Sequence, residues 1–542
     1  MIVHDPTFGP IVNFEDLRRD LHVVYDEVFP HFNLLGVVHR LSELGGDHPS
    51  VSIAGGASIL AYSLIVAAGE DELAASLKDK IFTLGWTEEH CGSDLLSVRT
   101  EATPIAGDPS GRMFHIRGQK WLINNSFHGD YHVVVGKLDP EQSGPRALSL
   151  FLVPRSSTRN WNRLATHVLT NMVLTEFEID GPGRLLGRPG QGLAIIQQMA
   201  NASRYQCTFM GVRMVAHAIP ATIEHLSSKR IFGDNPVQFS NVFRQLHDLV
   251  LQAAFYDFVM YRSVALNRSD FLAFYGTMLK SWLLLRINEL LGQNLLVAGS
   301  KGFLRESIIG RVAIDSFVLP VFDGHYTINT LMTAKQARRY VEADTPVDLE
   351  ERMDRLRRNL FHETHHGELH VDARDVRRPS FFDYADYVER LALPIHVPAR
   401  ALIDAARSVI DLIDERGLGN DLEHRYKVGD LVHWLESILA AAEMWKVTGV
   451  DAYLNLIVQQ FNSTVNTLND IVAQSDLDTP FMQPIRHLPI AQPADPRAYL
   501  LDLLDVRGRS GAGPYPASGT GVSASIGVRH ERMAEPALAS DR

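Results

Sequence analysis

The spacing of hydrophobic residues changes along the chain, and the changes divide it into segments of different structure. Across residues 14–80 apolar positions recur three and four apart, as at Leu17, Leu21 and Val24, which is typical of amphipathic helices. Across residues 81–187 the pattern becomes short runs of β-branched and aromatic residues, separated by turns rich in Gly, Asp and Pro. This second segment is therefore predicted to be a compact β-domain.

Helical spacing returns after residue 190 and continues almost to the end of the chain. The stretches Ala194–Ser228, Asn241–Ser263 and Phe271–Leu296 are long enough to form a helix bundle. A further helical region covers residues 349–506. Residues 507–542 contain almost no bulky apolar side chain, which predicts a disordered tail.

The pattern as a whole predicts a mainly α-helical protein with a central β-domain. The predicted division is a short N-terminal helical domain (1–80), the β-domain (81–188), a helix bundle (189–345), an extra helical region (346–506) and the tail (507–542).

Composition narrows the class of protein. Of the 542 residues 45% are hydrophobic and 21% charged, which is an ordinary globular composition. The formal net charge of −12, with basic residues scattered, argues against a nucleic-acid partner. With two cysteines, no basic apolar leader and no uncharged apolar run of about 18 residues, we expect a cytoplasmic protein without a membrane span.

The first motif with possible chemistry is Trp86–Asp94, at the start of the β-domain. Gly92 lets the backbone approach a ligand closely, and the hydroxyls of Thr87 and Ser93 can bind carbonyl oxygens. On its own this segment would be interpreted as a polar turn.

Further motifs follow in a fixed order. They are Gly118–Asn125 (GQKWLINN), Ser203-Arg204 at a helix start, Lys229–Gly233 (KRIFG), Gly299–Phe303 (GSKGF) and Val321–Gly324 (VFDG). Together with Trp86–Asp94, this set resembles the acyl-CoA dehydrogenase family over roughly residues 60–345. The corresponding family motifs are T-E-x-x-x-G-S-D, G-x-K-x-x-I-x-N, R-x-x-F-G, G-G-x-G-F and E-G-T.

The resemblance implies a fold and a cofactor. The family has an N-terminal helical domain, a β-barrel-like domain and a C-terminal four-helix bundle, with FAD between the last two. Because its FAD site takes residues from a second subunit, we expect a homodimer or homotetramer. By resemblance the cofactor contacts are Leu84, Thr87, Gly92, Ser93, Leu122, Asn124, Lys229, Arg230, Phe232, Gly299, Gly302 and His325.

Three of these positions depart from the family pattern. Leu122 and Asn124 stand where the family usually has an aromatic and a hydroxyl residue against the flavin, so an apolar wall and one donor remain. Lys229 replaces an arginine that reaches the FAD pyrophosphate, which keeps the charge but not the bidentate fork. The adjacent Arg230 is the candidate substitute.

Asp323 is the predicted catalytic base, and Arg204 is predicted to lie near it. The family normally has glutamate at this position, so the carboxylate of Asp323 is one methylene shorter. In a dry pocket, burial would raise its pKa and improve it as a base. Ser203 occupies the family's alternative base position and cannot serve. The competing interpretations are that Asp323 caps a helix at Thr327 and that Arg204 forms a salt bridge inside the bundle.

The preferred hypothesis is FAD-dependent α,β-dehydrogenation of an acyl thioester carried by CoA or an acyl carrier protein. Asp323 takes the α-proton, the β-hydride passes to flavin N5, and hydrogen bonds to the thioester carbonyl stabilise the charge. Electrons would leave to an acceptor flavoprotein or to oxygen. The alternatives are a flavin oxidase or monooxygenase acting on a small carbon acid, and a non-catalytic AidB-like flavoprotein. Nitroalkane oxidases, for example, place an aspartate in a similar F-D-G context.

The remaining features carry little chemistry. The helical region after residue 345 resembles the extension of the AidB-like branch in position and length. His362–His366 satisfies H-E-x-x-H, but it lies in a charged, histidine-rich segment without a third ligand, so no metal is predicted. Cys91 and Cys207 are interpreted as buried thiols.

Overall fold

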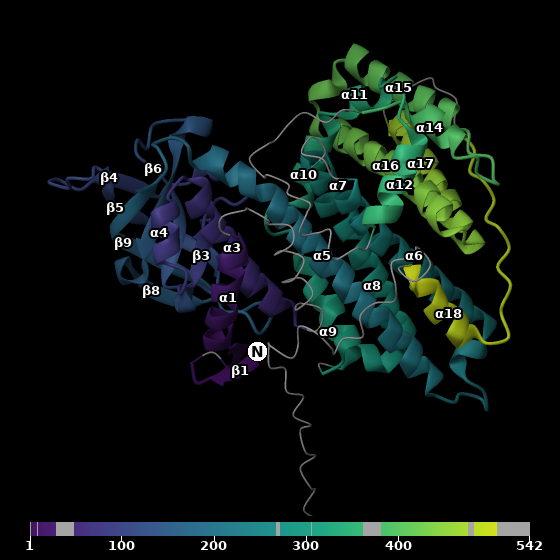
Figure 1. Ribbon diagram of the computed structural model, residues 1–542, viewed down its shortest axis with the longest axis horizontal. Helices are drawn as coiled ribbons and strands as arrows, with labels where there is room; N and C mark the ends of the chain where they lie inside the picture. Colours follow the sequence, from purple (N-terminus) through teal and green to yellow (C-terminus); the bar gives the residue numbers. More distant parts are fainter. Residues whose placement is uncertain are drawn as a thin grey trace, which may run out of the picture.

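The computed structural model describes residues 2–7, 9–28, 48–266, 272–304, 306–360, 381–474 and 482–506 (Figure 1). The predicted tail (507–542) and the H-E-x-x-H segment (362–366) lie outside the described residues.

The N-terminal part is helical, but it begins with a small hairpin that the apolar pattern did not predict. The hairpin pairs β1 (Ile2–Asp5) with β2 (Gly9–Val12). The helices that follow are α1 (Phe14–Val28), α3 (Pro49–Ala67) and α4 (Asp71–Ser76).

Helix α3 forms the core of this part of the molecule. It is uncharged and, by length and composition, apolar enough to cross a membrane, so the expectation that no such run exists is wrong. Its most apolar stretch is 83% buried inside the protein, which is the behaviour of a core helix. Its Tyr62 stacks on Tyr25 of α1 with ring centroids 4.2 Å apart, and Tyr25 Oη lies 2.6 Å from Ser58 Oγ.

The β-domain is a seven-stranded sheet that closes on itself. Its strands are β3 (Phe82–Gly85), β4 (Glu101–Pro104), β5 (Met113–Asn124), β6 (Tyr131–Lys137), β7 (Leu148–Pro154), β8 (Thr158–Arg163) and β9 (Leu174–Leu186). The pairings β6–β4, β4–β5, β5–β9, β9–β7 and β7–β6 complete a ring. Buried and partly exposed residues alternate along β9, as a strand with one face on a core requires. The ring agrees with the predicted barrel-like domain.

A break in this sheet presents one of the predicted cofactor contacts. The pairing of β5 with β9 shifts register between Lys120 and Ile123, and Leu122 has a φ of 60° there. An irregularity of this kind re-aims a side chain. Leu122 is 41% exposed as a result.

The bundle lies beside the β-domain, with α5 running from one to the other (Figure 1). Its helices are α5 (Gly192–Ser227), α6 (Ser240–Ala265), α7 (Leu272–Met278), α8 (Leu284–Ala298), α9 (Ile308–Asp315), α10 (Tyr326–Ala334) and α11 (Ala337–Val341). The helix predicted at Phe271–Leu296 is interrupted by a π-helical segment, Leu279–Leu283. Such segments are rare and often mark functional sites.

The extra C-terminal region shares one hydrophobic core with the bundle. It contains α12 (Leu349–Asn359), α14 (Tyr384–Arg390), α15 (Ala399–Glu415), α16 (Leu422–Thr448), α17 (Leu454–Gln474) and α18 (Pro496–Leu504). Arg262 of α6 pairs with Glu436 of α16 at 2.8 Å and also with Glu443, and Arg352 of α12 pairs with Glu443 at 2.7 Å. These buried charges compensate one another, so they fix α16 against the bundle.

Three asparagines on α17 hold the extended segment that leads to α18. Asn455, Asn462 and Asn469 stand seven residues apart, and they bond the backbones of Leu488, Ile485 and Met482 respectively. In each case the backbone N–H donates to Oδ1 and the side-chain amide donates to the carbonyl oxygen, at 2.8–3.3 Å.

Candidate functional site

The turn before α10 presents Asp323. Asp323 (φ 53°) and Gly324 (φ 94°) are consecutive residues in the left-handed region, which costs a non-glycine residue about 1–2 kcal/mol. Ser203 Oγ, on α5, donates a hydrogen bond of 2.6 Å to Asp323 Oδ2. The strained turn and this bond aim the carboxylate at the start of α5.

Two expectations about Asp323 need correction. Its side chain is exposed in this chain, so the predicted burial is not provided by the described residues. The cap of α10 is His325, whose Nδ1 accepts a hydrogen bond of 3.2 Å from the backbone N–H of Thr327. The alternative that Asp323 serves as the helix cap is therefore wrong.

Lys280 is a neighbour of this turn that the sequence analysis missed. It lies on the π-helical segment, is fully buried, and donates a hydrogen bond from Nζ to the carbonyl oxygen of Leu319. Its ammonium group stands 4.7 Å from the centroid of the Phe322 ring. Burial lowers the pKa of Lys280, although Cys207 and Asp323 oppose this. Its only sequence signal is a lysine inside the apolar run Phe271–Leu296.

Arg204 lies one residue from Ser203, and its guanidinium has little compensation. Nη1 donates to Asn201 Oδ1 at 2.8 Å and Nη2 contacts Met332 Sδ at 3.6 Å. Within the described part of the chain it forms no salt bridge, so the predicted alternative of an ion pair inside the bundle is not observed there. Burial lowers the pKa of Arg204 to about 10.

The β-domain contributes the other side of the candidate site, opposite the residues of the bundle. Thr87 Oγ1 donates to the carbonyl oxygen of Trp121 at 2.6 Å, which ties the Trp86–Asp94 loop to β5. Leu84 on β3 is half-buried, whereas Gly92 and Ser93 are exposed at the turn of this loop.

Two buried polar atoms accompany the exposed Leu122 on this side of the site. Asn124 donates from Nδ2 to the carbonyl oxygen of Ile53 at 3.2 Å, but its Oδ1 is buried without a hydrogen-bond partner in the described structure. Trp86 Nε1 is likewise buried without a hydrogen-bond partner in the described structure. Leu122 offers an apolar surface, and Asn124 and Trp86 offer an acceptor and a donor without partners, a combination that fits a flavin.

The other predicted cofactor residues lie at the far end of α5. Lys229 is half-buried; Arg230 donates to the carbonyl oxygen of Gly233 at 3.3 Å. Phe232 has a φ of 51° and is 97% exposed. Gly299 (φ 67°) begins the turn after α8, and a Cβ on Gly302 would lie 2.8 Å from the carbonyl oxygen of Leu295, so Gly302 allows a tight backbone contact.

The predicted contacts therefore form two groups. Ser203, which bonds Asp323, and Ser227, beside the second group, both lie on α5. They are 24 residue steps apart, which corresponds to about 36 Å at the helical rise of about 1.5 Å per residue. The second group of one chain is therefore far along α5 from the base turn.

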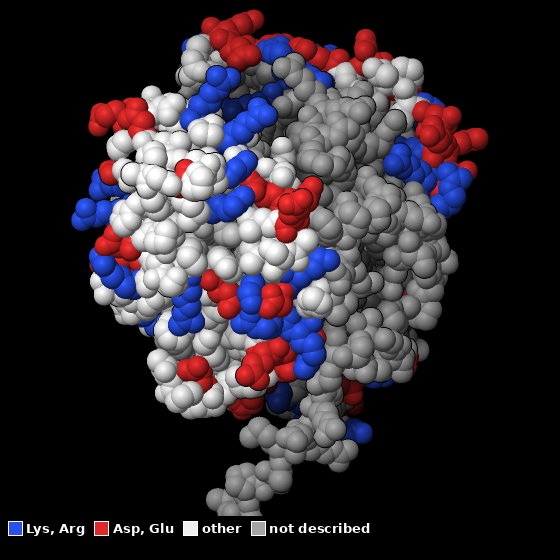
Figure 2. Space-filling model, turned by 60° about the vertical axis from the view of Figure 1, so that its left-hand side comes forward, with Lys and Arg blue, Asp and Glu red and all other residues white. Residues whose placement is uncertain are grey.

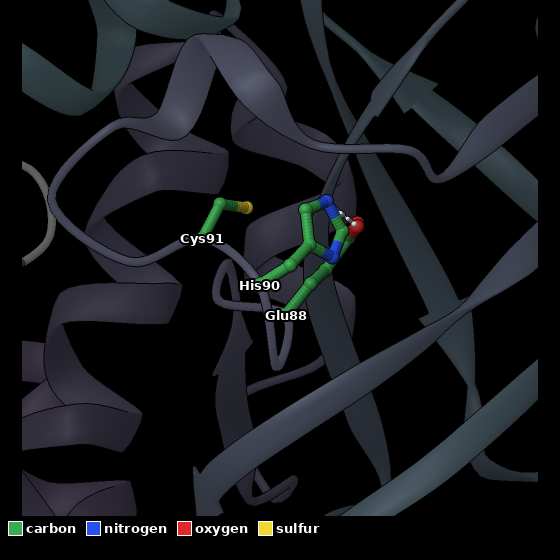
Figure 3. Close-up of side chains that lie close together, drawn as sticks. All are labelled: Glu88, His90 and Cys91. Atoms are coloured by element: carbon green, nitrogen blue, oxygen red, sulfur yellow. Dashed lines mark ion pairs between the residues drawn. The ribbon is translucent and has the colours of Figure 1, made fainter.

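Glu88, His90 and Cys91 lie close together in the Trp86–Asp94 loop (Figure 3), with their ligand atoms within 4.8 Å of one another. Glu88 is already committed to the buried Lys120 at 2.9 Å and to the Thr100 hydroxyl at 2.6 Å. Burial, together with the Glu88 charge, raises the pKa of the Cys91 thiol, which disfavours the thiolate that metals bind. We therefore interpret this cluster as structural.

The surface on the β-domain side carries mixed charge. Figure 2 shows basic and acidic side chains interspersed over the described part of this face, without a continuous basic stripe.

Two family models match adjoining parts of the chain. The acyl-CoA dehydrogenase middle domain matches residues 83–179, and the acyl-CoA dehydrogenase C-terminal domain matches residues 190–337. The first covers the β-domain and the second covers α5 to α10. Over these two regions the chain belongs to the acyl-CoA dehydrogenase family.

Relatives with curated names agree with this assignment. Cyclohex-1-ene-1-carbonyl-CoA dehydrogenase of Geobacter metallireducens is 25% identical over 46% of this chain and 67% of its own length. The putative acyl-CoA dehydrogenase AidB of Escherichia coli is 31% identical over 29% of this chain and 28% of its own length. The chain thus spans about a quarter to two thirds of the length of these relatives.

A solved structure matches almost the whole chain. An acyl-CoA dehydrogenase of Bacillus anthracis, complexed with FAD, has a TM-score of 0.59 and 16% identity, and the match covers 93% of each chain. The predicted fold class is confirmed, and a match of this extent includes the extra C-terminal region. The prediction of an FAD-dependent oxidoreductase acting on CH–CH groups is confirmed at the level of the family.

Proposed function

We propose that the protein catalyses FAD-dependent α,β-dehydrogenation of an acyl thioester, carried by CoA or by an acyl carrier protein, with Asp323 as the base. The observation that carries this proposal is the carboxylate of Asp323, held on a strained turn by Ser203 at 2.6 Å, within a family of acyl-CoA dehydrogenases.

Different residues of the chain would orient the base, remove the α-proton and line the site. Ser203 occupies Asp323 Oδ2 with its hydrogen bond, which leaves Oδ1 to take the proton from the α-carbon. FAD, when bound, would supply the acceptor for the hydride of the β-carbon. The two carbons become joined by a double bond. Leu122 and Leu84 would supply the apolar wall on the β-domain side.

The cofactor residues support a second element of the proposal, a homodimer or a dimer of dimers. The group at Lys229, Phe232 and Gly299 lies about 36 Å along α5 from the base, given the helical rise. It would therefore complete the FAD site of a partner subunit. Apolar side chains are exposed near it, including Phe232 (97%), Leu296 (71%) and Phe303 (71%). Exposed apolar patches mark association sites.

A second candidate substrate class is a small carbon acid such as a nitroalkane. The observation that favours it is that position 323 holds an aspartate, which is shorter than the family's glutamate. The carboxylate of Asp323 accepts a hydrogen bond from Ser203. Electrons would then pass to oxygen, whereas a thioester dehydrogenase would pass them to an acceptor flavoprotein.

Anaerobic reduction of the purified yellow protein separates the two substrate classes. We expect a panel of acyl-CoA and acyl-carrier thioesters to bleach the flavin absorbance, with nitroalkanes leaving it unchanged. Oxygen consumption with nitroalkanes, and no bleaching by any thioester, would instead establish the second candidate. A colourless protein that takes up no added FAD would contradict both.

A further inference from the structure

Helix α16 of the extra C-terminal region packs against α10, the helix that follows the Asp323 turn (Figure 1). The two helices approach each other closely at Gly429. A Cβ added there would lie 2.3 Å from the backbone carbonyl oxygen of Thr330. No side chain fits at this point, so the spacing of the two helices depends on glycine.

One turn further along α16, His433 joins three elements. It is buried, and its Nε2 lies 3.0 Å from Thr333 Oγ1 on α10 and 3.5 Å from Ser281 Oγ on the π-helical segment. Thr333 Oγ1 is in turn 3.1 Å from Thr277 Oγ1, at the end of α7. A single imidazole therefore connects α16 to both elements that support the base turn.

Both α10 and the π-helical segment form hydrogen bonds to the backbone of the base turn or of the residues just before it. From α10, the buried Asn329 donates from Nδ2 to the carbonyl oxygens of Gly324 and His325, at 2.9 and 3.2 Å. From the π-helical segment, Lys280, the neighbour of Ser281, donates to the carbonyl oxygen of Leu319. The turn is thus held at both ends by elements that meet at His433.

We propose that α16 is a positioning element for the base, with His433 as the positioning residue that fixes α10 and the π-helical segment relative to each other. The extra region is then a structural part of the active site. The inference rests on the proposed function only for the role of Asp323, because the bracing of the turn is a property of the fold.

The first test is the rate of flavin reduction in three variants of α16. His433→Phe removes the polar contact at similar size, and Gly429→Ala pushes α16 from α10 without removing a polar group. We expect each to slow flavin reduction at least tenfold, with the affinity for thioester and for FAD unchanged. His433→Gln keeps a polar atom near the Nε2 position and should recover most of the rate.

Ser437→Ala is the matched control, since Ser437 is buried on the same helix but bonds Gln460 of α17 at 3.1 Å instead of α10. Its reduction rate should equal that of the wild type. An equal loss in Ser437→Ala and His433→Phe, or wild-type rates in both His433→Phe and Gly429→Ala, would overturn the proposal.

Hydrogen exchange of the backbone amides of residues 320–330 provides a readout that does not need turnover. We expect faster exchange there in His433→Phe and Gly429→Ala, and unchanged exchange in Ser437→Ala. Unchanged exchange in all three variants would refute the bracing itself. Faster exchange, in a protein whose flavin no thioester reduces, would uphold the bracing and refute only the proposed function. If His433→Phe does not fold, the exchange rates of residues 320–330 in Gly429→Ala decide whether α16 braces the turn.

Discussion

Lys120 lies buried beneath the Trp86–Asp94 loop and neutralises Glu88. Burial opposes the ionisation of Glu88, but Lys120 and the hydrogen bonds from Thr100 and Arg99 outweigh it and hold the pKa of Glu88 below its usual range. We expect Lys120→Met to destabilise the fold by about 3–5 kcal/mol, because it leaves a carboxylate buried and unpaired. Denaturant unfolding measures this. A loss no larger than that of Lys137→Met, a half-buried lysine on β6, would contradict it.

Two buried histidines make stability depend on pH. Burial lowers the pKa of His132 and of His433 to about 3, from an ordinary value near 6.5. Between these values the unfolded chain binds protons that the folded chain does not. Stability therefore falls as pH decreases from about 6.5 towards 3, and is unaffected above that range.

The size of this effect can be checked with one variant. Between pH 7 and pH 5 each histidine should account for a loss of about 2 kcal/mol in the free energy of unfolding. His132→Gln should therefore lose about 2 kcal/mol less than the wild type over this interval. Equal losses in the variant and the wild type over this interval would contradict the depressed pKa of His132.

Among individual residues, the sequence indicates those that lie in a local motif and misses those whose role depends on contacts distant in the sequence. The turn that presents Asp323 could be predicted because its VFDG context is local. Lys280, His433 and Gly429 could not, since their roles come from contacts with residues far along the chain. A lysine in an apolar run signals a buried charge, but not what it binds.

Among the elements, the asparagines of α17 allow a test of the extended segment 482–488. Asn462→Ala removes two hydrogen bonds to Ile485, each of 2.8–2.9 Å. We expect a loss of about 1–3 kcal/mol and faster cleavage by trypsin after Arg486. Asn466→Ala, on the same helix but outside this set, is the control. Equal cleavage rates in both variants would contradict the account.

Element lengths were easier to predict than interruptions. The bundle helices α5 and α6 match their predicted ranges closely, because long 3.6-residue patterns define them. The hairpin β1–β2 and the π-helical segment were missed, since each is short and set by tertiary packing. The uncharged run of α3 was overlooked because serines and glycines interrupt its apolar residues.

At the scale of the whole molecule, we expect a dimer whose two subunits share each FAD site. We expect Leu296→Asp with Phe303→Asp to yield a monomer in sedimentation velocity, with loss of bound FAD. Both side chains are 71% exposed in one chain. Leu422→Asp changes a side chain that is 63% exposed on α16, and it should leave the oligomer and the cofactor intact. A monomeric wild type with full FAD occupancy would contradict the shared site.

Stopped-flow reduction of the flavin in Asp323→Asn tests whether Asp323 is the base. The amide keeps the size of the side chain, so FAD should remain bound with its visible absorbance unchanged. We predict that the rate of reduction by the best thioester falls by a factor of about 10²–10⁴, whereas Asp323→Glu retains measurable activity. Reduction of Asp323→Asn at a rate near that of the wild type would contradict the account.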